Sequence, residues 1–236
     1  MERPELSAIV LCYRAEESIR RVIEPLDEQL RESGVAYELV LVANYSDGVE
    51  DSTPEIVEEF AAPRARVRTV IGPKAGAMGW DMRSGFEAAL GDYMVVIDGD
   101  AQNPVGDVLE MYRRMLQTGA EVMKGRRIAR FDSHYRAFIS TAYNVLFRFI
   151  FRTGRLWDIN GKPKGLTRSA YERLELRSDD WFIDAEIILQ ARRRGMRIAE
   201  LPVVFHDNEH RASFVRASAI WEFIVNMARQ RLWPGR

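Results

Sequence analysis

The chain has 236 residues, 47% of them hydrophobic, which is enough to build one sizeable α/β core. Its formal net charge of −1 argues against a nucleic-acid-binding protein that works by overall electrostatic attraction, so we expect no nucleic-acid partner. The single cysteine, Cys12, cannot form an internal disulfide, Met1–Glu5 lacks a secretory pattern and no apolar stretch is long enough to span a bilayer, so we expect a cytoplasmic location.

The first half of the chain alternates predicted strands with predicted helices. A continuous apolar run predicts a buried strand at Leu6–Cys12, and apolar residues at helical spacing predict a helix at Glu16–Leu30. The same pattern then repeats along the chain. Further buried strands are predicted at Glu38–Val42, Val67–Ile71 and Tyr93–Ile97, and further helices from Ser52 onward and at Trp80–Leu90.

The second half begins with the same alternation and then changes. A helix at Pro104–Leu116 and a strand at Glu121–Lys124 are followed by a long aromatic and basic helix at His134–Thr153. The alternation predicts an α/β fold with a mostly parallel central sheet and helices on both faces, in a single domain over residues 1–236. The remaining predicted elements are a loop at Asp158–Gly165, a helix at Phe182–Arg194, a strand at Arg197–Phe205 and an amphipathic helix at about Ala217–Leu232.

Two carboxylates follow directly on the predicted strand at Tyr93–Ile97. Asp98 and Asp100 therefore emerge at the carboxyl edge of the sheet, where open α/β sheets bind ligands, and Gly99 allows a tight bend between them. Carboxylate oxygens at this spacing can hold one hard divalent cation that also coordinates a diphosphate, and Gln102 adds a neutral oxygen. The sequence thus predicts a site for Mg²⁺ or Mn²⁺.

The segment from Gly91 to Pro104, GDYMVVIDGDAQNP, resembles the donor-binding segment of family 2 glycosyltransferases, above all the dolichyl-phosphate or polyprenyl-phosphate sugar synthases. The resemblance extends from Ser7 to about Phe214. It implies a nucleotide-sugar-binding fold of the GT-A type and a hexosyltransferase that uses a nucleoside diphosphate sugar. In that family the two aspartates of the DXD motif and a following glutamine bind the metal. The resemblance therefore implies metal ligation by Asp98, Asp100 and Gln102, with Asp98 also at the donor.

The chain departs from the family pattern where the first two strands end. The pattern Pro-x-Tyr-Asn-Glu becomes Cys12-Tyr13-Arg-Ala-Glu16, so the resemblance implies Tyr13 and a displaced Glu16 as donor-binding residues. The paired aspartates that meet the nucleotide base become Ala43-Asn44. An asparagine amide suits the adjacent N–H and carbonyl of uracil, so UDP is favoured over GDP if Asn44 contacts the base. The alternative is that Asn44 only turns the chain.

The acceptor side is predicted from a cluster of cations. Eleven Lys and Arg but only two Asp lie between Lys124 and Arg168. Charge runs are commonly solvated helix faces, but aromatic residues alternate with these cations, which favours an anionic surface or a phosphate as partner. The resemblance implies that Arg126 holds the acceptor phosphate. It also implies that Lys164 replaces the arginine of the family's Asp-x-x-Ser-Gly-x-Arg loop as a phosphate-facing cation.

Asp184 and Glu186 lie at the start of the predicted helix at Phe182–Arg194. Acids at this position complement the helix dipole, which is one explanation for them; catalysis is the other. If the acceptor is a hydroxyl, a carboxylate must act as general base, and Asp184 is the candidate. A phosphate acceptor is already anionic and needs no base.

We therefore expect a metal-dependent transferase that moves a sugar from a nucleoside diphosphate sugar to an acceptor, preferably a polyprenyl phosphate. Two alternatives stay open. One is a family 2 enzyme that acts on a hydroxyl of a saccharide or small molecule. The other is a catalytically silent regulator that binds sugar nucleotides.

A peripheral contact with the inner face of the membrane is expected from the helix at His134–Thr153. Its apolar side can lie among acyl chains while nearby arginines meet anionic head groups. The alternative is that the apolar stripe packs in the core and the arginines face water. The residues of the stripe are Tyr143, Leu146, Phe147, Ile150 and Phe151.

Overall fold

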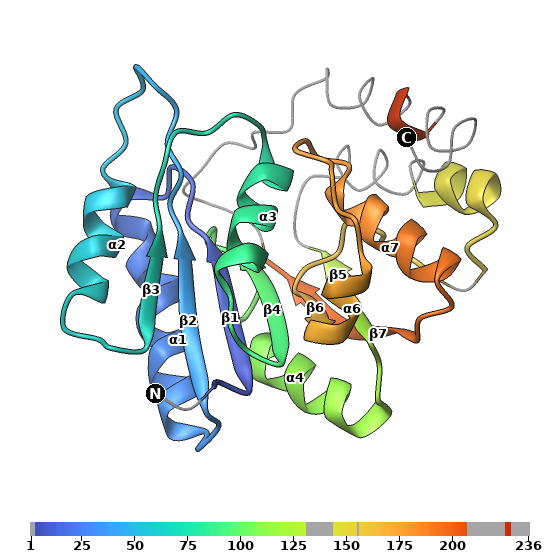
Figure 1. Ribbon diagram of the computed structural model, residues 1–236, viewed down its shortest axis with the longest axis horizontal. Helices are drawn as coiled ribbons and strands as arrows, with labels where there is room; N and C mark the ends of the chain where they lie inside the picture. Colours follow the sequence, from blue (N-terminus) through green and yellow to red (C-terminus); the bar gives the residue numbers. More distant parts are fainter. Residues whose placement is uncertain (1–2, 131–143, 155, 207–224, 228–236) are drawn as a thin grey trace.

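The computed structural model of the chain describes residues 3–130, 144–154, 156–206 and 225–227. Its strands form one seven-stranded sheet in the order β3-β2-β1-β4-β6-β5-β7 (Figure 1). Among these strands β6 alone runs antiparallel to its neighbours, β4 and β5, so the prediction of a mostly parallel sheet is confirmed. The strands are β1 (Leu6–Leu11), β2 (Tyr37–Val42), β3 (Val67–Val70), β4 (Tyr93–Asp98), β5 (Val122–Arg130), β6 (Lys164–Thr167) and β7 (Ile198–Phe205).

Helices cover both faces of the sheet (Figure 1). Apolar side chains of α1, α2 and α4 belong to one buried cluster, and those of α3 and α7 belong to the other. The helices are α1 (Arg20–Glu32, after a short 3-10 helix at Glu16–Ile19), α2 (Thr53–Ala61), α3 (Met78–Ala88), α4 (Gly106–Thr118), α6 (Arg168–Arg173) and α7 (Ile183–Arg193). Residues 144–151 are also helical.

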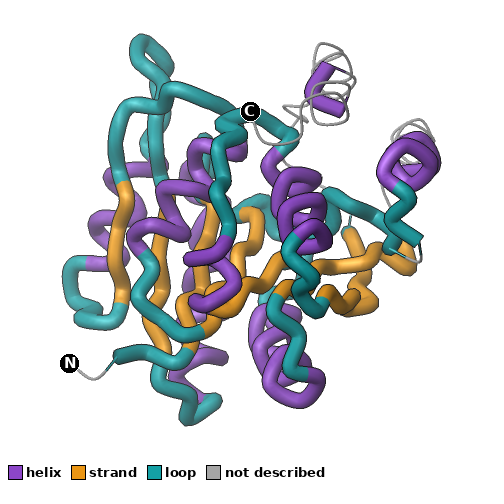
Figure 2. Tube along the Cα trace, turned by 45° about the vertical axis from the view of Figure 1, so that its right-hand side comes forward, coloured by secondary structure: helices purple, strands orange, loops and turns teal. Residues whose placement is uncertain are grey.

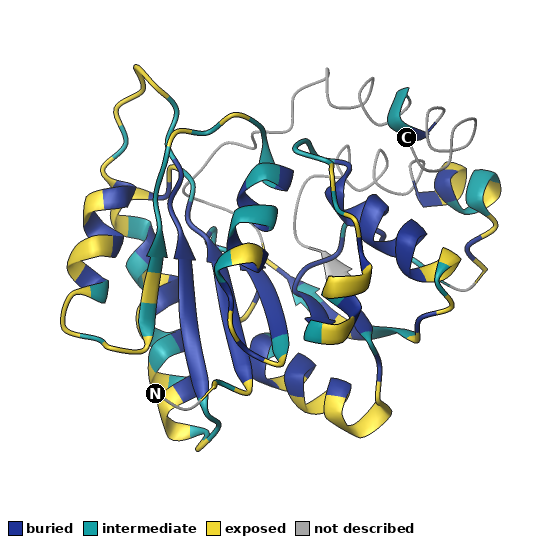
Figure 3. Ribbon diagram, in the orientation of Figure 1, coloured by how far each residue is buried: buried dark blue, intermediate teal, exposed yellow. Residues whose placement is uncertain are grey.

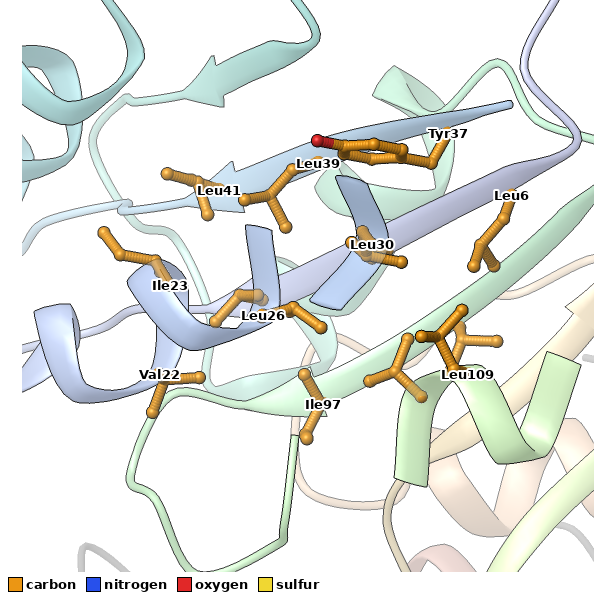
Figure 4. Packing of buried hydrophobic residues seen from close by; sticks show 14 of the residues in the cluster. Leu6, Val22, Ile23, Leu26, Leu30, Tyr37, Leu39, Leu41, Ile97 and Leu109 are labelled. Carbon is orange, nitrogen blue, oxygen red and sulfur yellow. The ribbon is translucent and has the colours of Figure 1, made fainter. Parts of the chain in front are cut away.

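The central strands are buried on both faces, which is why their sequences are continuous apolar runs (Figure 3). On one face Leu26 and Leu30 of α1 lie with Leu39 of β2 and Ile97 of β4 (Figure 4). Each fully buried leucine contributes about 1.5–3 kcal/mol relative to an exposed one. This packing fixes the strand ends from which the candidate site is built.

Helix α3 lies unusually close to the opposite face of the sheet. A Cβ atom at Gly85 would lie 2.6 Å from Cγ2 of Ile9 and 3.0 Å from Cγ2 of Val42, so only glycine permits this approach. The loops that follow β2 and β3 extend beyond the same end of the sheet (Figure 2) and are joined by a bridge between Tyr45 and Pro73. The start of α3 is therefore held beside the ends of β1 and β2.

Several predicted elements need correction. Strand β5 runs on to Arg130, beyond the predicted end at Lys124. Strand β6 begins inside the segment predicted as the loop Asp158–Gly165, and α6 was not predicted. The first residue of β6, Lys164, is charged, and a charged residue does not suggest a buried central strand. The local sequence therefore predicts a loop.

Part of two predicted helices lies outside the described residues. For the helix predicted at His134–Thr153, residues 144–153 are described, and the helix ends at residue 151. For the helix predicted at Ala217–Leu232, only residues 225–227 are described, and these are helical. Within the described part of the chain, no helix combines the length and the apolar character needed to cross a bilayer.

Candidate active site

The two acids predicted to hold a cation lie at the carboxyl end of β4. Asp98 is the last residue of this strand and pairs in register with Leu11 of β1. The N–H of Gly99 donates to the Leu11 carbonyl oxygen at 2.9 Å, and a Cβ atom at position 99 would lie 2.7 Å from that oxygen. Only glycine allows the turn to lie so close to β1, and this turn places Asp98 and Asp100 at the edge of the sheet.

The turn continues through a strained residue to Gln102. Ala101 has φ of +60°, a left-handed conformation that costs a non-glycine residue about 1–2 kcal/mol. The backbone N–H of Gln102 donates to Oδ1 of Asp100 at 3.1 Å, and its side-chain Nε2 donates to the carbonyl oxygen of His206 at 3.0 Å. These two hydrogen bonds fix the side chain of Gln102 beside Asp100.

Asp98, Asp100 and Gln102 carry carboxylate and amide oxygens, which are ligand types that Mg²⁺ and Mn²⁺ prefer. Mg²⁺ in particular is commonly held by one or two carboxylates together with phosphate oxygens and water. Among the described residues, no group of three His, Cys, Asp or Glu side chains converges as a complete metal site. A cation at this edge would therefore need Asp98, Asp100 and the Gln102 amide, with the rest of its ligands from a diphosphate.

The end of the sheet that is predicted to bind the donor contains two residues, Lys74 and Asp81, that the sequence did not single out. Asn44 follows β2 and is buried, and its Nδ2 donates to Oδ1 of Asp81, in the first turn of α3, at 3.0 Å. The other oxygen of Asp81 is paired with Lys74, whose Nζ lies 3.9 Å from the centroid of the Tyr13 ring. Burial raises the pKa of Asp81, and the charge of Lys74 limits that rise. In the sequence, Asp81 is marked only as a single acid near the start of the predicted helix at Trp80–Leu90.

Tyr13 and Glu16 are placed by the chain after β1. The Tyr13 hydroxyl lies 3.1 Å from Oγ of Ser46, in the loop after β2. Glu16 is exposed and has φ of +47°, and its backbone N–H donates to Oγ1 of Thr53 at 2.8 Å. The structure brings Tyr13 together with the Asn44 group, whereas it leaves the Glu16 carboxylate exposed beside the start of α2.

The Gly-rich loop before α3 is held by carbonyl groups from the second half of the chain. The backbone N–H groups of Ala77 and Trp80 both donate to the carbonyl oxygen of Asp179, at 2.6 and 3.2 Å. Glu186 of α7 fixes this partner loop, because its carboxylate accepts the N–H groups of Arg177 and Ser178. Glu186 therefore has a structural role, and the start of α3 already has hydrogen-bond acceptors.

Two neighbouring arginines on β5 have different surroundings. Arg127 binds the carboxylate of Asp158 through its guanidinium and its backbone N–H, the latter at 2.9 Å from Oδ2. Arg126 is exposed, and its guanidinium makes no hydrogen bond or ion pair to any residue that the structure describes. An exposed guanidinium of this kind is well suited to a phosphate. Arg126 is therefore available for the role that the resemblance implies, and Arg127 is not.

Lys164 does not face an open acceptor site. Its side chain is 0% exposed, and its Nζ donates to Asp184 and to the carbonyl oxygen of Ile159. Burial lowers the pKa of Lys164 to about 7, against the attraction of Asp184 and with a further contribution from Lys162. The prediction that Lys164 presents its charge to a phosphate is not met by this geometry, because the buried Nζ pairs with Asp184 of α7.

Asp184 is the common partner of two lysines. It is 1% exposed, and Nζ of Lys162 lies 2.7 Å from its Oδ1 and 3.0 Å from its Oδ2. Burial alone would raise the pKa of Asp184, but Lys162 and Lys164 reverse the shift and hold it below its ordinary value. A buried carboxylate with a low pKa and both oxygens engaged is a poor proton acceptor at neutral pH.

The model of the glycosyl transferase family 2 matches residues 7–174, which is most of the chain. The chain belongs to this family. The glycosyltransferase AglD of Haloferax volcanii is 31% identical over 211 residues, which cover 84% of this chain and 32% of that protein. The dolichol-phosphate mannosyltransferase of Pyrococcus furiosus is 24% identical over 239 residues, covering 98% of this chain and 65% of that protein.

A third relative is the undecaprenyl-phosphate 4-deoxy-4-formamido-L-arabinose transferase of Pectobacterium carotovorum, 28% identical over 144 residues, or 61% of this chain and 43% of that protein. The chain thus spans less than two thirds of the length of these relatives. Among solved structures, glucosyl-3-phosphoglycerate synthase from Mycobacterium tuberculosis aligns with a TM-score of 0.72 at 17% identity, covering 98% of this chain and 79% of that one. This likeness confirms the predicted GT-A type of fold.

Proposed function

We propose that the protein transfers a sugar from a nucleoside diphosphate sugar to a polyprenyl phosphate, with Mg²⁺ or Mn²⁺ held by Asp98, Asp100 and Gln102. The observation that carries the choice of acceptor is the ion pairing of Asp184 with Lys162 and Lys164. This pairing makes Asp184, the candidate general base named from the sequence, a poor proton acceptor. An acceptor that is already anionic needs no such base.

The proposed binding of the donor is supported by the residues that follow the ends of β1, β2 and β4. A divalent cation at this position would neutralise the charge that develops on the leaving diphosphate. Tyr13 and Asn44 lie where the strand ends meet and would hold the nucleoside, with uracil favoured over guanine. The fold neighbour from Mycobacterium tuberculosis was solved with Mn²⁺ and UDP, which agrees with this assignment.

The acceptor end is supported by Arg126 and by the names of the relatives. Arg126 lies on β5 with its guanidinium exposed, whereas its neighbour Arg127 is held by Asp158. Two of the relatives act on dolichol phosphate or undecaprenyl phosphate by name. Arg126 would orient the acceptor phosphate so that its oxygen attacks the anomeric carbon of the donor sugar. Lys162 and Lys164 would not contact the acceptor, but would hold the segment between residue 158 and β6 in place.

A membrane contact would be made by a set of residues that shares only Leu146 with the predicted stripe. Phe147 is 0% exposed and packs against Phe151, with ring centroids 4.7 Å apart, so this part of the stripe belongs to the core. In the described helix of residues 144–151, the exposed apolar residues are Val145, Leu146 and Phe149, the last at 83%. We propose that these three meet the cytoplasmic face of the membrane.

This apolar face is linked to the acceptor end through one short segment. Oδ1 of Asn144 accepts the N–H of Ile159 at 2.9 Å, and the Ile159 carbonyl oxygen accepts from Lys164. Arg148 lies over the Trp157 ring, 4.1 Å from its centroid. A lipid contact at the helix of residues 144–151 would therefore bring a membrane-bound acceptor toward the segment that ends in β6.

A comparison of two acceptors tests the proposal. The full chain is incubated with Mn²⁺, a labelled UDP-sugar or GDP-sugar, and either a polyprenyl phosphate or the same polyprenol without phosphate. Transfer to the phosphate alone supports the proposal, and loss of transfer in EDTA supports the cation. Transfer to the free polyprenol or to a saccharide, with none to the phosphate, would replace the proposed acceptor by a hydroxyl.

A further inference from the structure

Four side chains from four separate segments form a continuous chain of contacts at the donor end. Tyr13 follows β1, Asn44 follows β2, Lys74 follows β3 and Asp81 belongs to α3. Lys74 contacts the Tyr13 ring at 3.9 Å and pairs with Asp81, and Asp81 accepts from Asn44 at 3.0 Å. The side chains of Lys74 and Asp81 are 7% and 3% exposed, so the ion pair is shielded from solvent.

This arrangement fixes which way the amide of Asn44 points. An ionised carboxylate can only accept hydrogen bonds, so Asp81 can bind the Nδ2 of Asn44 but not its Oδ1. Turning the amide over would place two acceptor oxygens against each other in a buried position. Oδ1 of Asn44 instead lies on the side of Gly72, 3.8 Å from where a Cβ atom at that glycine would be. Asn44 therefore presents a carbonyl oxygen on the side away from Asp81.

We propose that Asp81, paired with Lys74, is a positioning residue that sets the amide of Asn44 so that its Oδ1 accepts the ring N–H of a uracil base. The inference rests on the proposed function, because it requires a nucleotide at this edge of the sheet. Uracil carries a hydrogen on N3, whereas the same nitrogen of cytosine is an acceptor. A fixed carbonyl oxygen therefore attracts uracil and repels cytosine.

The ion pair also explains how the site can use a carboxylate without adding net charge. The charges of Asp81 and Lys74 compensate each other inside the protein. An aspartate at position 44 itself would bring a second carboxylate close to Asp81. The neutral Asn44 avoids that repulsion. It donates to Asp81 through Nδ2 and offers the base its own carbonyl oxygen, Oδ1, as the acceptor.

The experiment compares UDP with CDP by titration calorimetry in Mn²⁺. The wild-type protein is expected to bind UDP about 10- to 100-fold more tightly, the usual effect of a mismatched buried hydrogen bond. In Asp81→Asn the residue can donate as well as accept, so the Asn44 amide can turn either way and the preference should fall to within about 3-fold. Asp27→Asn is the matched control, because Asp27 lies on α1 and accepts from the hydroxyl of Tyr37, the first residue of β2, whereas Asn44 follows the other end of that strand. The UDP-to-CDP ratio of this control should stay that of the wild type.

A second variant covers the case in which Asp81→Asn does not fold with Lys74 left unpaired. The double variant Lys74→Met, Asp81→Asn carries no buried charge and should show the same loss of preference. If the folded variants keep the UDP-to-CDP ratio of the wild-type protein, the inference is overturned while donor binding stays intact. The same holds if the wild-type protein itself binds CDP more tightly than UDP. Failure of the wild-type protein to bind either nucleotide would overturn the proposed function and this inference with it.

Discussion

Nζ of Lys162 lies 2.7 Å from Oδ1 of Asp184, and both side chains are almost completely buried. Lys164 contacts the same carboxylate from the first position of β6. Asp184 on α7 therefore joins the segment before β6 to the rest of the fold, and this assigns it a structural role rather than that of a proton acceptor.

Replacement of Asp184 separates these two roles. Asp184→Asn removes the carboxylate that pairs with the buried Lys162 and Lys164, so the free energy of unfolding should fall by about 3–5 kcal/mol in urea denaturation. Transfer to polyprenyl phosphate, measured at low temperature where the variant stays folded, should persist. A variant of normal stability whose kcat is reduced about 10²-fold or more, the loss expected on removing a general base, would restore Asp184 as a catalytic residue.

Lys164 should make the stability depend on pH above neutrality. Its pKa in the folded protein is about 7, well below the ordinary lysine value of 10.5, so between these pH values the unfolded chain binds more protons. The free energy of unfolding should therefore rise with pH over that interval, by at most about 1.4 kcal/mol per pH unit for one group. Urea denaturation at several pH values measures the slope, and Lys164→Met should lack this contribution. A wild-type slope equal to that of the variant contradicts the prediction.

Removal of one predicted metal ligand should weaken donor binding. Asp100→Ala is expected to reduce the affinity for UDP in Mn²⁺ by at least about 10-fold, a loss seen even for residues that only support a metal ligand. The measurement is calorimetry with and without EDTA. Asp92→Ala is the control, because Asp92 is exposed, pairs with Arg3 at the surface and lies at the opposite end of β4. Unchanged affinity in Asp100→Ala would remove the metal assignment.

Flotation with liposomes tests the exposed apolar face. Binding should require anionic lipid, weaken with salt, and fall when Leu146 and Phe149 are changed together to Ser. Leu116→Ser removes a similarly exposed leucine from α4 and should bind as the wild type does. Phe147→Ser is unsuitable here, because loss of a fully buried phenylalanine should cost about 3–5 kcal/mol of stability. Wild-type protein that does not float at low salt would rule out the contact.

The sequence predicted strands well where both faces are buried. β1, β2 and β4 consist mostly of apolar residues, and their ends agree with the predicted ends to within one residue. β6 could not be found in this way, because its first residue carries a charge that is compensated by Asp184, twenty positions further along. No local pattern reveals such a partner.

The same limit applies to the candidate site. The position of Asp98 at the end of β4 follows from the strand pattern alone, although its role stays a prediction. Asp81 and Lys74 could not be assigned, because their relation to Asn44 exists only after α3 packs against the sheet through Gly85. Asp184 and Glu186 were correctly placed on one helix, but their partners come from loops that the sequence does not connect to them.

The place of β6 in the sheet has a consequence for synthesis on the ribosome. Among the strands that the structure describes, β6 lies between β4 and β5 and pairs with both, and β5 pairs on its other side with β7. Until residue 167 has emerged, the growing chain therefore holds β4 as an open edge and β5 without either neighbour. Unpaired edges of apolar strands invite pairing with other chains. The nascent protein should be most prone to aggregate in this interval, and most dependent on chaperones, before its last third has been made.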